Sequence, residues 1–283
     1  MGNFFDKPAL VALKLLPKEF MSRFIGKISG KKLPKIILVP WIRLYCDIYG
    51  ADMRESKKSI PEFGTFNEFF TRELKPGVRK IDSSKNAIIS PVDGTITEFG
   101  RIEKNILIQA KGKTYSLESL LENHELSKKF GNGSFITIYL APENYHRIHA
   151  PVSGKISGYC YIPGSLFPVS NFSLRAIYGL FSRNERLITY IEHKKQMLAV
   201  VKIGACLVGK IRANYENISF DSSQKTKSEK KYVGKIPVKK GEEIGRFEIG
   251  STVILLFEKS AVEFEGISRG MKIKMGEKIG VVL

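Results

Sequence analysis

The sequence predicts an α+β fold in which basic, amphipathic N-terminal helices precede a β-rich body with duplicated, sandwich-like hairpins. Three observations predict it. Apolar residues recur at helical spacing near the N-terminus, short runs rich in Val, Ile, Thr and Tyr dominate from residue 88 onward, and two pairs of short segments repeat. We therefore expect a basic helical region over residues 1–60 and a β-rich domain over residues 61–283.

The composition limits the classes of protein that fit this fold. Hydrophobic residues make up 43% of the 283 residues, which is typical of a folded protein and excludes wholesale disorder. The formal net charge of +18 requires an anionic partner, usually nucleic acid or a lipid surface. The three cysteines lie far apart without a CxxC motif, which excludes a disulfide scaffold. No apolar run approaches the ~20 residues that span a bilayer, and we expect no secretory signal.

The first helix is predicted near residue 20, where five apolar residues share one face of a helical wheel: Phe20, Met21, Phe24, Ile25 and Ile28. Gly30 would end this helix. The first 42 residues hold eight basic groups against two acidic ones. Such a helix can lie in the interface of an anionic membrane, or its apolar face can pack on the protein's own core, and the pattern leaves both open.

The next element begins at a capping box, in which Thr65 precedes Glu68 by three residues. We expect a helix from Phe66 to Leu74, ending before a Pro-Gly pair. The β-rich part then contains three clear strand patterns, at residues 135–140, 198–203 and 252–257. The segment 221–240 carries seven lysines and is predicted to be a solvated hairpin or loop.

Two pairs of segments repeat within the β-rich part. The run SPVDGTI at residues 90–96 is similar to APVSGKI at 150–156, and KGEEIG at 240–245 is similar to MGEKIG at 275–280. Paired hairpins of this kind indicate a sandwich of two similar β halves, as in lipoyl or biotinyl carriers and hybrid barrels. This analogy concerns the fold and leaves the function open.

Four residues attract attention as candidates for chemistry: Asp93, His146, His149 and Ser251. Each alone is typical of an ordinary structural position, but Asp, His and Ser together can form a nucleophilic triad. Ser251 lacks the GxSxG elbow of a hydrolase and follows Gly250, whose carbonyl is open to attack by the serine hydroxyl. That arrangement favours an intramolecular N→O acyl shift. The sequence has no HxH or HExxH motif, so we expect no metal.

The run EFGTFNEFFTRELKPG at residues 62–77, followed by PVDG, YHRIHAP and GST in that order, closely resembles the bacterial phosphatidylserine decarboxylase family. The match covers about residue 60 to the C-terminus. One departure is Ile249, where the family more often has Leu before Gly-Ser-Thr. The resemblance implies a proenzyme that cuts itself between Gly250 and Ser251, with Ser251 as nucleophile, His149 as base and Asp93 orienting the histidine.

The products of that cleavage, according to the resemblance, are a β chain of residues 1–250 and an α chain of residues 251–283. The α chain would begin with a covalent pyruvoyl group derived from Ser251, without pyridoxal phosphate or metal. This carbonyl would form a Schiff base with phosphatidylserine, and loss of CO₂ would yield phosphatidylethanolamine. His146 is the candidate proton donor, since an imidazole with a pKa near 6.5 exchanges protons at neutral pH, although His149 could serve both steps.

The resemblance also implies partners and a location. We expect a peripheral protein on the cytoplasmic side of the cell membrane, with the basic N-terminal region on an anionic lipid surface. A homodimer of processed units is expected, and no nucleic-acid partner, because no helix-turn-helix, zinc finger or aromatic RNA-binding platform is present.

Two further alternatives come from other classes of protein. A serine hydrolase would use Asp93, His149 and Ser251 without self-cleavage. A carrier domain would need a modifiable lysine at a hairpin tip, and Lys272 and Lys274 lack the usual Met-Lys-Met context.

Overall fold

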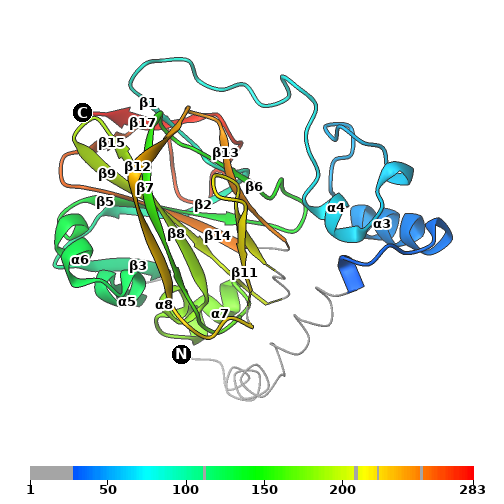
Figure 1. Cartoon of the computed structure of the whole chain (residues 1–283), viewed down its shortest axis with the longest axis horizontal. Helices are drawn as coiled ribbons and strands as arrows, with labels where there is room; N and C mark the ends of the chain where they lie inside the picture. Colours follow the sequence, from blue (N-terminus) through cyan, green and yellow to red (C-terminus); the bar gives the residue numbers. More distant parts are fainter. Residues whose placement is uncertain (1–27, 111–112, 207–209, 222, 249–250) are drawn as a thin grey trace.

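The computed structural model describes residues 28–283 except 111–112, 207–209, 222 and 249–250. Strands form most of the body, and a small helical region lies to one side of it (Figure 1). This arrangement confirms the predicted α+β class. In the described residues, no helix is long and apolar enough to cross a membrane.

The described strands form four antiparallel sheets. The eight-stranded sheet has the order β12 (Ser228–Val238), β7 (Gly154–Ile162), β8 (Arg186–His193), β9 (Gln196–Ile203), β14 (Ser251–Phe257), β5 (Ser134–Leu140), β2 (Gly94–Arg101) and β16 (Lys272–Ile273). The four-stranded sheet has the order β11 (Ile218–Phe220), β10 (Ile211–Ala213), β13 (Glu243–Phe247) and β6 (Arg147–His149). The smaller sheets are β1 (Ala87–Ile89), β17 (Lys278–Val282) and β15 (Val262–Phe264), and the hairpin β3 (Ile106–Ala110) and β4 (Lys113–Ser116).

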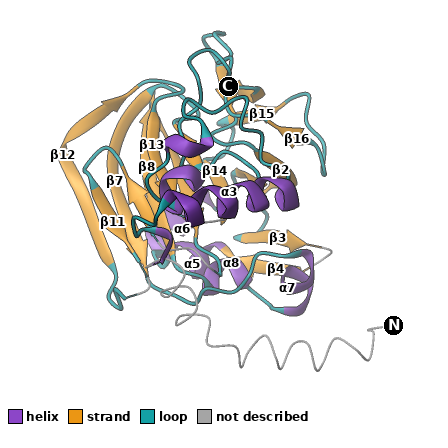
Figure 2. Cartoon of the chain, turned by 90° about the vertical axis from the view of Figure 1, so that its right-hand side faces the viewer, coloured by secondary structure: helices purple, strands orange, loops and turns teal. Residues whose placement is uncertain are grey.

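The helices fall into two groups. The first comprises α3 (Lys35–Tyr49), the 3₁₀ turn η1 (Ile60–Glu62) and α4 (Phe66–Phe70). The second lies around the β3–β4 hairpin (Figure 2) and comprises α5 (Leu117–Leu121), α6 (His124–Phe130), α7 (Asn171–Ala176) and α8 (Leu180–Arg183). The first group has its own apolar cluster, which extends across the expected boundary at residue 60 and contains Leu38, Ile42, Ala51, Phe63, Phe66, Phe69 and Phe70.

Most predicted elements are present, with instructive differences. The Thr65 hydroxyl caps α4 by accepting the Glu68 N–H at 3.0 Å, but the Glu68 carboxylate accepts from Gly64 at 2.6 Å and the helix ends at Phe70. Helix α3 lies within the region predicted to be helical, but its bounds were not predicted, because Pro40 lies inside it. The expected helix near residue 20 lies outside the described residues, apart from a short helical segment at its end.

The three predicted strands are confirmed as β5, β9 and β14. Segment 221–240 is not a loop throughout, because residues 228–238 form β12 at the edge of the eight-stranded sheet. Its side chains are mostly exposed, and lysines on an edge strand oppose pairing with another chain. The lysine pattern therefore indicated solvent exposure correctly but not the secondary structure.

The predicted internal repeat is present in the backbone hydrogen bonds. We call residues 90–94 with 274–277 the first turn pair, and residues 150–154 with 239–242 the second. Gly276 donates its N–H to the Ser90 carbonyl at 3.1 Å, and Gly241 donates to the Ala150 carbonyl at 2.8 Å. The reverse bonds, from Ser90 and Ala150 to the glutamate that follows each glycine, are both 2.8 Å. Both glycines have positive φ, which favours glycine over other residues.

The two turn pairs also contact each other in a matched way. The Ile89 N–H donates to the Pro151 carbonyl at 3.1 Å, and the His149 N–H donates to the Pro91 carbonyl at 2.8 Å. Each copy of the repeat, meaning a turn pair with the residue before it, thus binds the turn of the other copy. The residues that donate are Ile89, before Ser90, and His149, before Ala150. The repeat therefore places His149, from the second copy, beside the turn that carries Asp93 in the first.

Candidate active site

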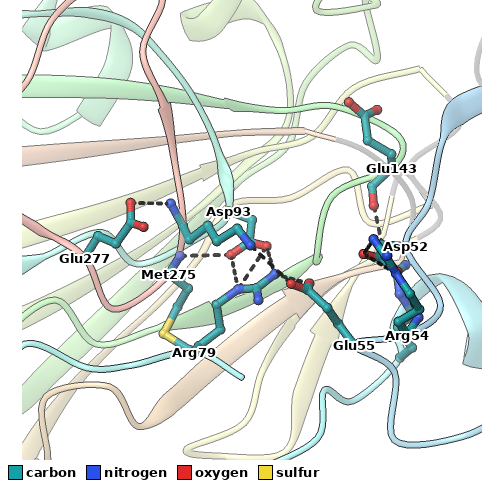
Figure 3. A network of polar contacts seen from close by, with 10 residues as sticks. Asp52, Arg54, Glu55, Arg79, Asp93, Glu143, Met275 and Glu277 are labelled. Atoms are coloured by element: carbon teal, nitrogen blue, oxygen red, sulfur yellow. Dashed lines mark hydrogen bonds and ion pairs between the residues drawn. The ribbon is translucent and has the colours of Figure 1, made fainter. Parts of the chain in front are cut away.

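Asp93 lies at the end of the turn between β1 and β2 and is only 5% exposed. Its carboxylate accepts from the Arg79 Nε at 2.9 Å and from Arg79 Nη2, and also from the Met275 backbone N–H at 2.9 Å (Figure 3). Arg79 also binds Glu55 at 2.6 Å. Among the described residues, Arg79 and Met275 are the hydrogen-bond partners of Asp93, and His149 is not one of them.

Arg79 is as buried as Asp93 and holds two carboxylates. Burial disfavours the charged form of Arg79, but the hydrogen bonds to Asp93 and Glu55 outweigh this effect. They raise the pKa of Arg79, which remains charged. The hydrogen bond from Arg79 also lowers the pKa of Glu55. Lys274 extends this network by pairing with Glu55 at 3.1 Å. The network holds the Asp93 carboxylate in place and offsets part of its charge.

His149 is held at both ring nitrogens. Nδ1 lies 2.8 Å from the Gly241 carbonyl, which can only accept, so Nδ1 carries the proton. Nε2 of the neutral ring is therefore an acceptor, and the Tyr145 hydroxyl donates to it at 3.0 Å. Burial lowers the pKa of His149, while the hydrogen bond to Gly241, the charge of Glu243 and, least of the three, the charge of Asp93 act in the opposite direction. The ring is neutral at neutral pH and presents a basic Nε2.

His146 lies in a different environment from His149. It is fully buried and stacks on Phe70 of α4, with ring centroids 4.1 Å apart. Burial, then the positive charge of Arg72, lower the pKa of His146 to about 3. The ordinary pKa on which its expected role rested therefore does not apply in this structure, where the ring is neutral.

Ser251 is the first residue of β14, where its backbone pairs with Leu140 at the end of β5. Leu140 leads directly into the loop that carries His146, and the Phe247 N–H donates to the His146 carbonyl at 3.1 Å. The chain on both sides of the Gly250–Ser251 bond is therefore tied to the histidine segment. Gly250 and the side chain of Ser251 lie outside what the structure describes.

Three groups that contact Asp93 or His149 were not predicted from the sequence, namely Arg79, Tyr145 and the Gly241 carbonyl. Tyr145 could have been predicted, because it lies in the same YHRIHAP motif. It is four residues before His149, and on an extended segment two such residues project from the same side. The other two come from distant parts of the chain. No group of three or more His, Cys, Asp or Glu side chains in the described part of the chain is placed to hold a metal ion.

Comparison with known proteins identifies the family. The sequence profile described as phosphatidylserine decarboxylase matches residues 66–281. The chain belongs to the phosphatidylserine decarboxylase family. It is 39% identical over 278 residues to the phosphatidylserine decarboxylase proenzyme of Myxococcus xanthus (strain DK1622), covering 98% of this chain and 99% of the relative. The proenzyme of Anaeromyxobacter sp. (strain K) is 40% identical over 278 residues, covering 97% and 98%.

A third phosphatidylserine decarboxylase proenzyme, from Brevibacillus brevis, is 40% identical over 267 residues, which cover 93% of this chain and 94% of the relative. These matches confirm the resemblance drawn from the four ordered motifs. They extend through the helical region as well as the β-rich body. The serine-hydrolase alternative receives no support from them.

Proposed function

We propose that this chain is a phosphatidylserine decarboxylase proenzyme that cleaves itself between Gly250 and Ser251 and then converts phosphatidylserine into phosphatidylethanolamine and CO₂. One observation carries the proposal beyond family membership. A neutral histidine, His149, has its tautomer fixed so that Nε2 can accept a proton, and its segment is tied to the strand that begins at Ser251.

In self-cleavage, the Ser251 hydroxyl attacks the Gly250 carbonyl and gives its proton to His149 Nε2. The peptide C–N bond breaks, an ester forms, and the proton passes to the leaving amine. The Asp93 carboxylate stabilises the imidazolium that forms in between, because its charge favours protonated His149. Elimination of the ester, followed by hydrolysis, releases ammonia and leaves a pyruvoyl group at residue 251.

The pyruvoyl group supplies a carbonyl that takes up the electrons left when the substrate loses CO₂. The strand context fits such a group, because residue 251 would become the free end of β14, which lies between β5 and β9. His146 remains our proposed proton donor. As a neutral ring it would donate its N–H proton from a position enclosed by Phe70.

The two chains would remain associated after cleavage. Residues 251–283 contribute β14 to the middle of the eight-stranded sheet and β17 to the middle of the three-stranded sheet. Separating them would expose fully buried side chains of β14 such as Val253 and Leu255. We further propose a homodimer of processed units, which light scattering of the purified enzyme tests directly.

We propose peripheral association with the cytoplasmic face of an anionic membrane, where the substrate lies. Helix α3 supports this, because Ile36, Leu44 and Ile48 lie at multiples of four residues and are 84%, 57% and 64% exposed. Leu44→Glu should reduce sedimentation with phosphatidylglycerol vesicles severalfold, because a charge on an inserted face is costly. Val233→Glu, on exposed edge strand β12, is the matched control. Equal sedimentation of both variants and the native chain would contradict the proposal.

An intact mass spectrum of denatured protein tests the proposed function. At the mean of about 113 Da per residue (31.9 kDa over 283 residues), the α and β chains should weigh about 3.7 and 28 kDa. The smaller should react with a carbonyl reagent, and Ser251→Ala should give one species of 31.9 kDa. A single 31.9 kDa species in active native preparations would reject self-processing.

His146→Ala should cleave normally but release CO₂ slowly, and near-normal CO₂ release would reject its role as proton donor.

A further inference from the structure

A cavity of about 460 Å³ lies between the helical region and the four-stranded sheet. None of Asp93, His146, His149 and Ser251 lines it. Its lining contains three glutamates and six basic residues, which are Lys57, Lys58, Arg72, Arg147, Arg212 and Arg246. We call it the arginine cavity, and its positive excess is the first indication of an anionic ligand.

Three of these arginines form one row across the sheet. Arg147 of β6 is the register partner of Arg246 of β13, which is the register partner of Arg212 of β10. Register partners in antiparallel strands project from the same face, and like charges directly opposite each other are destabilising. A row of three guanidinium groups therefore needs negative charge in front of it.

Glutamates neutralise only part of this charge. Arg147 pairs with Glu243 at 2.8 Å and Arg212 pairs with Glu248 at 2.9 Å. Within the described residues, the only carboxylate paired with Arg246 is the same Glu243, at 3.8 Å, which Arg147 already holds at closer range. Burial, then Arg147 and Arg212, lower the pKa of Arg246, in agreement with a guanidinium that lacks its own carboxylate.

Among the described residues, Arg72 is the second guanidinium of the cavity without a carboxylate of its own. It is 4% exposed, its Nη2 donates to the Glu143 carbonyl at 2.9 Å, and it stands over the Phe69 ring. Its Nε and Nη1 have no hydrogen-bond partner within the described chain, and it forms no ion pair there. A buried, unpaired charge is strongly destabilising. The two lysines, by contrast, are occupied, since Lys57 and Lys58 pair with the other two lining glutamates.

We propose that the arginine cavity binds a phosphate-class oxyanion, with Arg72 and Arg246 as its main donors. Guanidinium groups match phosphate oxygens through paired N–H donors, which explains why arginines and not lysines are the groups left unpaired.

The position of the cavity favours the phosphodiester of the lipid head group as the source of this anion. Glu248 lines the cavity and is three residues from Ser251, a chain length of at most about 11 Å. In phosphatidylserine a short carbon spacer joins the phosphodiester to the reacting amine, so one molecule can reach both places. This assignment of the source rests on the proposed function, whereas anion binding does not. Inorganic phosphate offers the same chemistry and serves as the probe.

The first experiment measures inorganic phosphate binding to the purified full-length protein by titration calorimetry. Arg246→Gln should weaken binding about tenfold to a hundredfold, as expected for loss of a charge-assisted hydrogen bond. Arg246→Lys should recover part of this loss, and Arg101→Gln, at the exposed end of β2, should bind like the native protein. Arg246 is a quarter exposed, so its replacement should not prevent folding. Phosphate binding that is absent from the native protein, or unchanged in Arg246→Gln and Arg212→Gln, would overturn the proposal.

The second experiment separates the two sources of the anion, using phosphatidylserine in detergent micelles and variants whose cleavage has been verified by mass. Competition by phosphate, with a KM raised about tenfold in Arg246→Gln and kcat within about twofold, identifies the substrate phosphodiester. Phosphate that binds through Arg246 without competing identifies a site for free phosphate, which also supports the cavity as an anion site. Failure of the proposed function would be recognised separately, as a native chain that neither cleaves nor releases CO₂.

Discussion

The two turn pairs have nearly the same backbone but very different chemistry. In the first, the Met275 N–H donates to the Asp93 carboxylate at 2.9 Å, and in the second the Lys240 N–H donates to the Ser153 hydroxyl at 2.9 Å. Asp93 is buried against Arg79, whereas Ser153 is exposed. The two turn pairs therefore share a backbone arrangement, and the residues proposed for catalysis lie where the two copies differ.

The second difference lies one position before each turn. His149 of the second copy corresponds to Ile89 of the first, as their matched hydrogen bonds to Pro151 and Pro91 show. Each copy therefore contributes one polar group, an aspartate or a histidine, at a different position of the repeat. Because each copy binds the turn of the other, the His149 backbone is hydrogen-bonded to the turn that carries Asp93, although neither copy alone contains both residues.

A substitution that makes the first copy resemble the second should have the largest effect on the rate of self-cleavage. Asp93→Ser keeps an acceptor for the Met275 N–H but removes the charge that stabilises protonated His149. We expect self-cleavage to slow by at least about a hundredfold, while Ser153→Ala in the second copy cleaves normally. The measurement is the cleaved fraction against time after synthesis, by mass spectrometry. Asp93→Ser that cleaves at the native rate would show that the carboxylate only supports the turn.

Removing the partner of Asp93 tests how the first copy tolerates a buried charge. Arg79→Met leaves the carboxylates of Asp93 and Glu55 without their main partner, and we expect a loss of roughly 3–5 kcal/mol in unfolding free energy. Arg54→Met, which breaks an exposed pair with Asp52, should change the unfolding free energy far less. Denaturant unfolding in an uncleavable Ser251→Ala background gives both values. Equal losses would refute the special position of Arg79.

Local patterns predicted the repeat and its strands, because alternating apolar residues and turn glycines act over a few neighbouring residues. The same patterns indicated Asp93, which lies inside the first repeated motif, and His149, which directly precedes the second, as candidates. They did not indicate Arg79 or Glu55, which are 14 and 38 residues before Asp93 and reach it only through tertiary packing. Ser251 was also a candidate from the sequence pattern, but a Gly-Ser at the start of a strand is common, and only the resemblance implied that it becomes a pyruvoyl group. The arginine row was missed because register joins residues up to 99 positions apart.

Lys202 extends the comparison to a buried amine that has no carboxylate partner in the part of the chain that the structure describes. It is fully buried on β9, donates to Thr189, and burial lowers its pKa to about 7. Its unfolded pKa is about 10.4, so between pH 7 and 10.4 the unfolded chain binds more protons and stability rises with pH. Lys202→Met should remove a slope of up to about 1.4 kcal/mol per pH unit and be the more stable protein at pH 7. Unfolding at several pH values checks this, and an unchanged slope would contradict it.

Replacing Tyr145 should have the smallest effect on the rate of self-cleavage, because the Gly241 carbonyl still holds the His149 ring at Nδ1. The Tyr145 hydroxyl donates to Nε2 of neutral His149 and thereby favours the neutral form, so Tyr145→Phe should raise the pKa of His149. Below that pKa the base is protonated and cannot accept the Ser251 proton. Cleavage of Tyr145→Phe should therefore slow by about tenfold or less at acidic pH and approach the native rate at higher pH. A pH profile of cleavage tests this shift, and a uniform decrease at every pH would instead indicate that Tyr145 orients the ring.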